Sequence, residues 1–262
     1  MDRDLKWTPF FVLLQREVRR FMKVLAQTIL TPMINSSLYL LIFGVSLGKS
    51  IDMGDISYLA FLIPGLVMMS CLNNSFQNSS SSIVSSKFNG ELEDYRVSPL
   101  SPQQIIWAFA LGGLTRGLIV GFITFTVGQV FYFVTQGEVL GLANPAHLLF
   151  FLVVGGLSFA TLGISVAFWA KTFDQMSAVG AFILLPLLYL GGVFFSIESL
   201  HPFWKGLAQL NPLLYMINGV RYGVLGVTDV SMMKAAGVSC LSFLVFYTVA
   251  LKTLGRGSFQ RW

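Results

Sequence analysis

The chain is short of charge and of polar sequence. Asp, Glu, Lys and Arg together make up 11% of its 262 residues, whereas soluble domains carry about 25%. Hydrophobic residues account for 55%, and the mean hydropathy is +0.72. The longest polar stretch, residues 73–104, is too short to fold as a domain of its own. We therefore expect one integral membrane domain over residues 1–262.

Reactive side chains are also scarce. The two cysteines, Cys71 and Cys240, lie in separate apolar runs, so we expect neither a disulfide nor a clustered metal site. The two histidines, His147 and His201, have no second ligand nearby in the sequence, and no H-E-x-x-H or G-x-S-x-G motif occurs. We assign no catalytic, metal-binding or cofactor-binding residue, which argues against a membrane-embedded enzyme.

Carboxylates are missing from the apolar runs. All twelve acidic residues fall near the ends of those runs or between them. Carriers that couple transport to protons or ions commonly hold ionisable groups at membrane depth. A self-sufficient secondary carrier or channel is therefore an alternative that the sequence disfavours but leaves open.

A phosphate-binding loop is absent too, although residues 44–50, GVSLGKS, look similar to one. The Walker pattern needs four residues between its glycines so that backbone N–H groups surround the phosphates. Here there are three, and Phe43 stands where the first glycine would be. If the protein carries out energy-driven work, ATP and Mg must be bound by another chain.

The chain does contain six long apolar runs. A helix of about twenty apolar residues crosses the bilayer core, so the predicted fold is an all-α, polytopic membrane protein with six transmembrane helices. The expected spans are residues 24–47, 57–80, 105–134, 147–170, 175–195 and 233–251. If the N-terminus is cytoplasmic, twelve Lys and Arg residues lie inside and four outside, so the positive-inside rule places both termini in the cytoplasm. The third run exceeds the membrane thickness, and we expect Arg116 near the interface.

Basic residues gather at the N-terminus. Six of the seventeen lie in the first 23 positions, ahead of an apolar run, which favours the lipid bilayer with its anionic surface, and not nucleic acid, as a partner of this cationic chain. Thr8-Pro9 is a helix start signal, and apolar residues then recur at three- and four-residue spacing. We predict an amphipathic interfacial helix over residues 8–23 on the cytoplasmic leaflet. A helix packed on a neighbouring subunit is the alternative.

Two irregular segments interrupt the apolar pattern. Residues 85–103 form a predicted cytoplasmic loop that contains the sequence GELEDYRVSPLSP, in which Gly90 breaks a helix and acidic residues follow. The pairs Ser98-Pro99 and Ser101-Pro102 mark the start of the next helix. Residues 191–221, GGVFFSIESLHPFWKGLAQLNPLLYMINGVR, contain paired glycines and two prolines. Irregular backbone at membrane depth is tolerated only inside protein or along an aqueous cavity. We therefore expect re-entrant short helices between spans 5 and 6, within an extracytoplasmic segment over residues 196–230. An ordinary solvated loop is the alternative for each segment.

Together these segments resemble the membrane subunit, or permease, of type-two ABC transporters. The family's coupling helix, which touches the ATPase subunit, is similar to GELEDYRVSPLSP, and its final-loop signature is similar to residues 191–221, with one extra residue before Pro202. The resemblance covers the whole chain and implies an exporter of a bacterial inner membrane. It further implies a homodimer of permeases with two copies of an ABC ATP-binding subunit. ATP hydrolysis then belongs to the partner, and this chain is not an enzyme.

The resemblance also assigns residues. The coupling residues are Gly90, Glu91, Leu92, Glu93, Asp94, Arg96, Ser98 and Pro99. The residues of the exit lid and re-entrant segment are Gly191, Gly192, Phe194, Glu198, Pro202, Asn211, Pro212 and Arg221. The implied substrate path lies at the dimer interface near spans 1, 2 and 5, where Asn73, Asn74, Gln77 and Asn78 can line it. Hydrogen bonds between helices are the alternative role for these four. We expect an amphiphilic or hydrophobic substrate.

Overall fold

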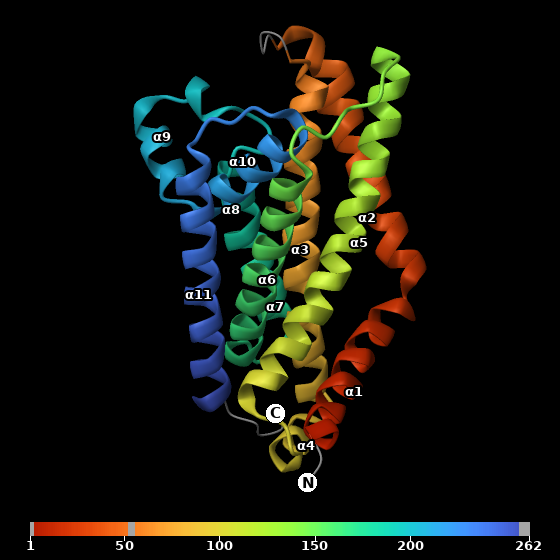
Figure 1. The fold of residues 1–262 in the computed structure, drawn as a ribbon, viewed down its shortest axis with the longest axis vertical. Coiled ribbons are helices and arrows are strands. Elements are labelled where there is room, and N and C mark those ends of the chain that lie inside the picture. Colours follow the sequence, from red (N-terminus) through yellow and green to blue (C-terminus); the bar gives the residue numbers. More distant parts are fainter. Residues whose placement is uncertain (1–2, 52–55, 257–262) are drawn as a thin grey trace.

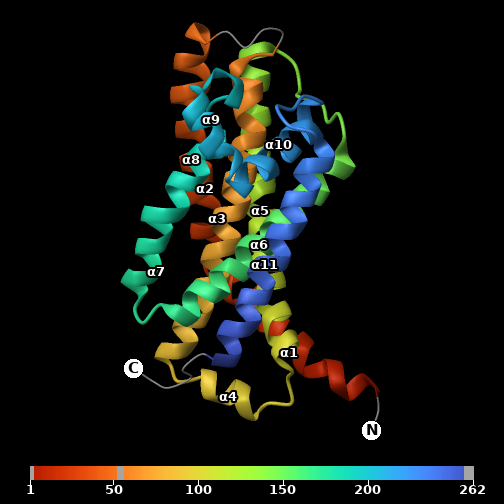
Figure 2. The same cartoon turned by 90° about the vertical axis from the view of Figure 1, so that its left-hand side faces the viewer.

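A computed structural model describes residues 3–51 and 56–256 as a bundle of helices (Figure 1). In chain order the α-helices are α1 (Arg3–Met22), α2 (Leu25–Tyr39), α3 (Tyr58–Phe88), α4 (Leu92–Val97), α5 (Pro102–Gln136), α6 (Pro145–Trp169), α7 (Phe173–Val179), α8 (Leu185–Leu190), α9 (Pro202–Gln209), α10 (Pro212–Leu225) and α11 (Met232–Arg256). No β-strand occurs in these stretches. The start of α1, α4 and the end of α11 lie at one end of the bundle, and α9 and α10 lie toward the other (Figures 1 and 2).

Six helical segments within the described residues are long and apolar enough to cross a membrane. Numbered as spans 1 to 6, they are Leu25–Leu47, Tyr58–Phe88, Pro102–Gln136, Pro145–Trp169, Phe173–Leu190 and Met232–Gly255. Each overlaps one predicted span, so the prediction of an all-α, six-helix membrane protein is confirmed. Span 1 joins α2 to a π-helical stretch, Leu40–Leu47, and span 5 joins α7 to α8 through a π-helical turn, Gly180–Leu184.

Span 2, formed by α3, is the centre of the bundle. In its most apolar stretch 83% of the residues are buried, compared with 22% in span 1 and 11% in span 5. Small residues let α5 approach α3 closely, because Gly113, Gly117 and Gly121 recur every four residues on the side that faces α3. A methyl group added at Gly117 would lie 2.7 Å from the carbonyl oxygen of Cys71. Spans 1 and 5 are therefore peripheral helices around a tightly packed centre.

Three helix boundaries differ from the sequence predictions. The prediction that Thr8-Pro9 starts the first helix is wrong, because α1 begins at Arg3. Pro9 lies inside the second turn of α1, where its missing N–H leaves out one backbone hydrogen bond. α3 continues to Phe88 because the serines of its second half are mostly buried against other helices and do not mark a loop. Span 5 ends at Leu190, since Gly192 adopts a φ of 80° that a right-handed helix cannot contain.

Polar caps set the starts of the helices on either side of the irregular segments. The Ser101 side chain accepts a hydrogen bond from the backbone N–H of Gln104, and the Gln104 side-chain oxygen accepts one from the backbone N–H of Ser101. Pro102 follows as the first residue of α5. The predicted start of this helix at the serine and proline pairs is confirmed. Asn211 caps α10 and donates to the carbonyl oxygen of Leu187 at 2.7 Å. This contact ties α10 to α8.

Candidate functional site

A polar groove lies between spans 1, 2 and 5. Two cavities, of about 260 Å³ and about 390 Å³, share Asn73, Gln77, Arg116 and Leu185 in their walls. Span 1 adds polar residues to the first cavity, namely Gln27, Thr28, Thr31, Asn35, Ser36 and Tyr39. No acidic residue is among the described residues that line either cavity. Amide and hydroxyl groups in such a groove can bind water or the polar part of a ligand.

Three of the four predicted pathway residues reach this groove. Asn73, Asn74 and Gln77 line the first cavity, and Gln77 donates to the side-chain oxygen of Asn73 at 3.3 Å. Asn78 is fully buried instead, and its backbone and side-chain oxygens accept hydrogen bonds from Arg20 of α1 at 2.7 and 3.1 Å. For Asn78 the structure favours the helix-contact alternative. For the other three, a role in transport stays a prediction.

Arg116 is a groove residue that the sequence did not group with the others. Its side chain lines both cavities from α5, opposite the amide residues of α3. Its expected place near the membrane interface stays a prediction. An ionisable residue within an apolar span is the sequence signal that could have marked it, because such residues usually face the interior or a cavity.

Aromatic rings gather beside the groove around Tyr39. The Tyr39 ring lines the first cavity and lies 5.6 Å from Phe194, which in turn lies 5.0 Å from Phe43 and 5.5 Å from Tyr189. The hydroxyl groups of Tyr39 and Tyr189 are 3.4 Å apart. We call these four residues the aromatic cluster. It joins span 1, span 5 and the segment after the paired glycines.

The two helices that meet in the aromatic cluster both contain π-helical turns. The π-helical stretch of span 1 includes Phe43, and the π-helical turn of span 5 directly precedes Leu185 of the groove wall. Such turns are rare and frequently mark functional positions. The groove is thus lined on two sides by irregular, peripheral helices and on the third by the rigid centre.

Arg221 ties the glycine break to α10. Its side chain is 1% exposed, and its Nη2 donates to the carbonyl oxygen of Gly192 at 2.7 Å. Its guanidinium carbon lies 3.7 Å from the centre of the Phe61 ring. Its Nη1 lies 3.4 Å from Asn218 Oδ1, which also accepts a hydrogen bond from the backbone of Asp229 at 3.1 Å. Carbonyl, amide and ring together compensate a buried cation that the sequence suggested to be a loop residue.

Asp229 closes the same network from the other side. Its carboxylate accepts hydrogen bonds from Ser196 Oγ at 2.8 Å and from the backbone N–H of Ile197 at 3.3 Å. Both ends of the predicted lid segment are therefore fastened to one another. No sequence pattern pointed to Asp229, because the partners of its carboxylate lie more than thirty positions away.

The remaining lid residues take separate positions. Gly191 is buried, Glu198 is exposed, and Pro202 is the first residue of α9. Asn211 caps α10, and Pro212 is its first residue. Two short helices are thus present where the sequence predicted them. Re-entry into the bilayer and a lid role stay predictions.

The predicted coupling segment contains the short helix α4. Gly90 has a φ of 74°, as expected for the break after α3. Leu92 is buried, whereas Asp94 and Pro99 are exposed at the end of the molecule. Ser98 donates to the carbonyl oxygen of Tyr95 at 2.8 Å as the helix ends. The side chains of Glu93 and Arg96 lie outside the described residues.

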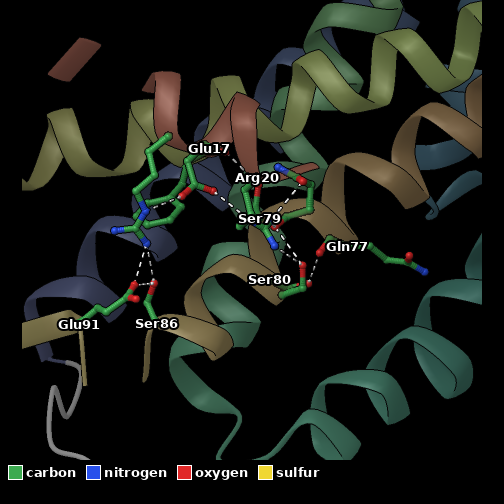
Figure 3. Close-up of polar contacts among 11 residues, drawn as sticks. Glu17, Arg20, Gln77, Ser79, Ser80, Ser86 and Glu91 are labelled. Atoms are coloured by element: carbon green, nitrogen blue, oxygen red, sulfur yellow. Dashed lines mark hydrogen bonds and ion pairs between the residues drawn. The ribbon is translucent and has the colours of Figure 1, made fainter. Parts of the chain in front are cut away.

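Glu91 is paired within the chain. Its Oε2 accepts hydrogen bonds from Arg16 Nη2 at 2.9 Å and from Ser86 Oγ at 3.2 Å (Figure 3). Arg16 also lies over the Tyr95 ring, with its guanidinium carbon 5.6 Å from the ring centre. α4 is therefore connected to α1, and the acidic surface expected around Glu91 is smaller than the sequence suggests.

A buried carboxylate completes this contact between α1 and α3 (Figure 3). Glu17 is 0% exposed, and its oxygens lie 3.6 Å from Arg20 Nε and 4.0 Å from Arg16 Nε. Burial raises the pKa of Glu17, against the opposing effects of Ser82 and the two arginines. The absence of a side chain at Gly112 provides space for Glu17, since a methyl group added at Gly112 would lie 2.7 Å from Glu17 Cβ.

Comparison with known proteins places these features in a family. A family model described as ABC-2 type transporter matches residues 8–225. The inner membrane transport permease YadH of Escherichia coli (strain K12) is 38% identical over 97% of this chain and 97% of its own length. Nodulation protein J of Neorhizobium galegae is 25% identical over 92% of this chain and 91% of its own length. The nodulation protein J of Rhizobium leguminosarum bv. viciae is 24% identical over 92% of both chains.

Proposed function

This chain belongs to the ABC-2 type transporter family, and we propose that it is the membrane subunit of an exporter driven by a separate ABC ATP-binding subunit. Family membership makes it a membrane transport subunit. The observation that carries the finer proposal is the polar groove beside α3, with Arg116 in its wall, inside an otherwise apolar bundle. A row of amides at that depth is costly unless it meets water, a ligand or another helix.

The proposed route follows the groove, at an interface with a second copy of the chain. Spans 1 and 5 are peripheral, and Gln77 is exposed between them. A second copy that covers this face would remove its amide from lipid. Leu66, Met69 and Leu185 stand beside the polar residues in the wall, which suits an amphiphilic substrate. The aromatic cluster and the segment over residues 191–230 would then form the exit lid.

We assign α4 to the contact with two copies of the ATP-binding subunit, which would hold ATP and Mg. Leu92 and Tyr95 anchor one side of the helix in the protein, while Asp94 and Val97 are exposed at the tip of the bundle. A helix that is anchored on one side can transmit movement from a partner. In this proposal the chain contributes no catalytic group of its own.

The proposed location is the bacterial inner membrane, with both termini in the cytoplasm. The printed name of the Escherichia coli relative supports the location. The beginning of α1 and the end of α11 lie at the same end of the bundle as α4, which suits an even number of spans (Figure 1). A reporter fused after Trp262 should give a cytoplasmic signal, and an extracytoplasmic one would overturn the orientation.

The test is transport by inside-out membrane vesicles with and without the ATP-binding subunit. Uptake that needs ATP and both subunits is expected for an exporter. Substrate movement through this chain alone in liposomes would instead favour the secondary carrier or channel. Asp94→Lys should weaken binding of the ATP-binding subunit, whereas Glu198→Lys is the matched control, because Glu198 is an exposed acidic residue on the far side of the molecule. Equal binding by both variants would remove α4 from the contact.

A further inference from the structure

A basic pocket lies between α1 and the end of α3, apart from the groove. Its volume is about 490 Å³, and Arg16, Arg19, Arg20 and Lys23 contribute to its wall from one side of α1. The opposite wall is polar and includes Ser85 and Asn89 together with Glu91. None of these residues lines the two cavities of the groove.

Two of the four cations already have carboxylate partners within the chain. Arg16 binds Glu91 at 2.9 Å, and Arg20 lies 3.6 Å from Glu17. The side chains of Arg19 and Lys23 are exposed and form no ion pair with any residue of the described part. The pocket therefore keeps about two unmatched positive charges beside several hydrogen-bond donors.

Exposed apolar side chains of α1 lie beside the basic residues of the pocket. Phe11 is 61% exposed and Val12 is 60% exposed, and Val12 itself is part of the pocket wall. Exposed apolar side chains next to basic ones are typical of a helix at a membrane surface. A small dissolved anion would contact only the basic residues, whereas a lipid would contact the basic residues with its head group and the apolar residues with its acyl chains.

We propose that this pocket binds the phosphate-bearing head group of an anionic membrane lipid. The phosphate would lie against Arg19 and Lys23, whose planar guanidinium and compact ammonium groups both suit phosphate oxygens. Head-group hydroxyls would meet the Ser85 and Asn89 side of the wall, and the acyl chains would run past Val12. The lipid would thereby fix α1 beside α4 and α3. The pocket shares no wall residue with the groove, so this proposal does not depend on the transport proposal.

The first experiment compares phospholipids on the purified, full-length chain. Phosphatidylglycerol, phosphatidylcholine and inorganic phosphate are added separately, and retention is counted by native mass spectrometry alongside the melting temperature. We expect phosphatidylglycerol to be retained and to raise the melting temperature more than the other two. Equal effects of inorganic phosphate would assign the pocket to soluble anions. Equal effects of phosphatidylcholine would show that head-group charge is not recognised. Either result overturns the proposal.

The second experiment removes the unmatched charges. Arg19→Gln with Lys23→Gln should weaken phosphatidylglycerol binding by about 30-fold at low salt, on the usual energy of a basic side chain near an anionic lipid surface. Lys205→Gln with Lys234→Gln is the control, since it removes the same charge at the other end of the bundle, from α9 and the first turn of α11. Unchanged retention by the first pair, or an equal loss in both pairs, would refute the site. Displacement of the lipid by the ATP-binding subunit would reassign the pocket to that partner.

Discussion

The two ends of the bundle both contain arginines, but they use them differently. At the α10 end Arg221 is 1% exposed, and a carbonyl oxygen and an aromatic ring surround it. At the α4 end the side chains of Arg16 and Arg20 are 42% and 31% exposed and are paired with carboxylates. The first arrangement needs no counter-ion in contact, because oriented dipoles replace water. The second is open to solvent and salt at the pair between Arg16 and Glu91, although its other carboxylate, Glu17, is buried.

This difference predicts how each end responds to change. In a buried hydrogen-bond network the partners cannot be replaced by water, so removal of one member should cause a large loss of stability. A hydrated network of ion pairs can rearrange, and screening by salt weakens it. We therefore expect the α10 end to determine stability and the α4 end to tolerate movement, which suits a contact with an ATP-driven partner.

The largest effect is expected for Arg221→Met. It leaves the carbonyl oxygen of Gly192 without its buried donor and Asn218 Oδ1 with the backbone N–H of Asp229 alone, at a cost of about 3 kcal/mol. Arg221→Lys keeps the charge but loses the planar stacking on Phe61, so it should be intermediate. The melting temperature in detergent and the membrane abundance report the change. If both variants match the native chain, Arg221 does not hold the glycine break.

A smaller effect is expected for Gly192→Ala. The φ of 80° places this residue in the left-handed region, where a side chain costs roughly 1–2 kcal/mol. The added methyl group would also lie 3.2 Å from the carbonyl oxygen of Phe195. Gly206→Ala on α9 is the control, because no atom lies within 4 Å of its added methyl group.

The same pair of variants tests the exit lid. If the segment moves during transport, Gly192→Ala should reduce export more than it reduces membrane abundance, whereas Gly206→Ala should change neither. Export that falls only in proportion to abundance would mean that the glycine serves packing alone. Normal export by the more disruptive Gly192→Leu together with Glu198→Ala, at normal abundance, would remove the lid from the mechanism.

Sequence reasoning located the spans and part of the groove for a clear reason. Hydropathy reports the length of a helix, and the amide residues Asn73, Asn74 and Gln77 follow the helical period, so they share one face of α3. The start of α5 was readable because its capping residues are adjacent in sequence. Each of these features depends on neighbours within a few positions.

The missed features all depend on partners far along the chain. Lys87 was counted as a cytoplasmic loop cation, but it is buried and donates to the carbonyl oxygens of Phe168 and Ala170 at the end of α6, at 2.9 and 3.1 Å. A positive charge is favourable there because helix ends expose unpaired carbonyls. Arg116 likewise gains its polar setting from spans 1 and 2. Hydropathy cannot reveal which helices become neighbours.

Glu17→Gln should change how stability depends on pH more than it changes the stability itself. The folded-state pKa of Glu17 is raised above its ordinary value of 4.5, so the group favours folding when protonated. That contribution is complete below pH 4.5 and is lost as the pH rises through the raised pKa. Unfolding measured across this range should show the native chain losing stability relative to Glu17→Gln as the pH increases. Parallel curves would mean that the carboxylate is not desolvated.

The smallest effect is expected at the ion pair between Arg16 and Glu91. Both side chains are about 40% exposed, at 42% and 39%, so the 2.9 Å contact should contribute only about 0.2–1 kcal/mol. A double-mutant cycle with Arg16→Gln and Glu91→Gln isolates that coupling from the separate contacts of Arg16 with Ser86 and Tyr95. The coupling should decline as salt is raised, because solvent reaches the pair.

A strong, salt-independent coupling would contradict the proposed contrast between the two ends. In that case α4 would be locked to α1 as firmly as α10 is locked to the glycine break, and movement would have to pass through α1 as a rigid body. A weak coupling leaves α4 free to shift against α1 at little energetic cost. If α4 contacts the ATP-binding subunit as proposed, the magnitude of this one interaction therefore distinguishes a flexible contact from a rigid one.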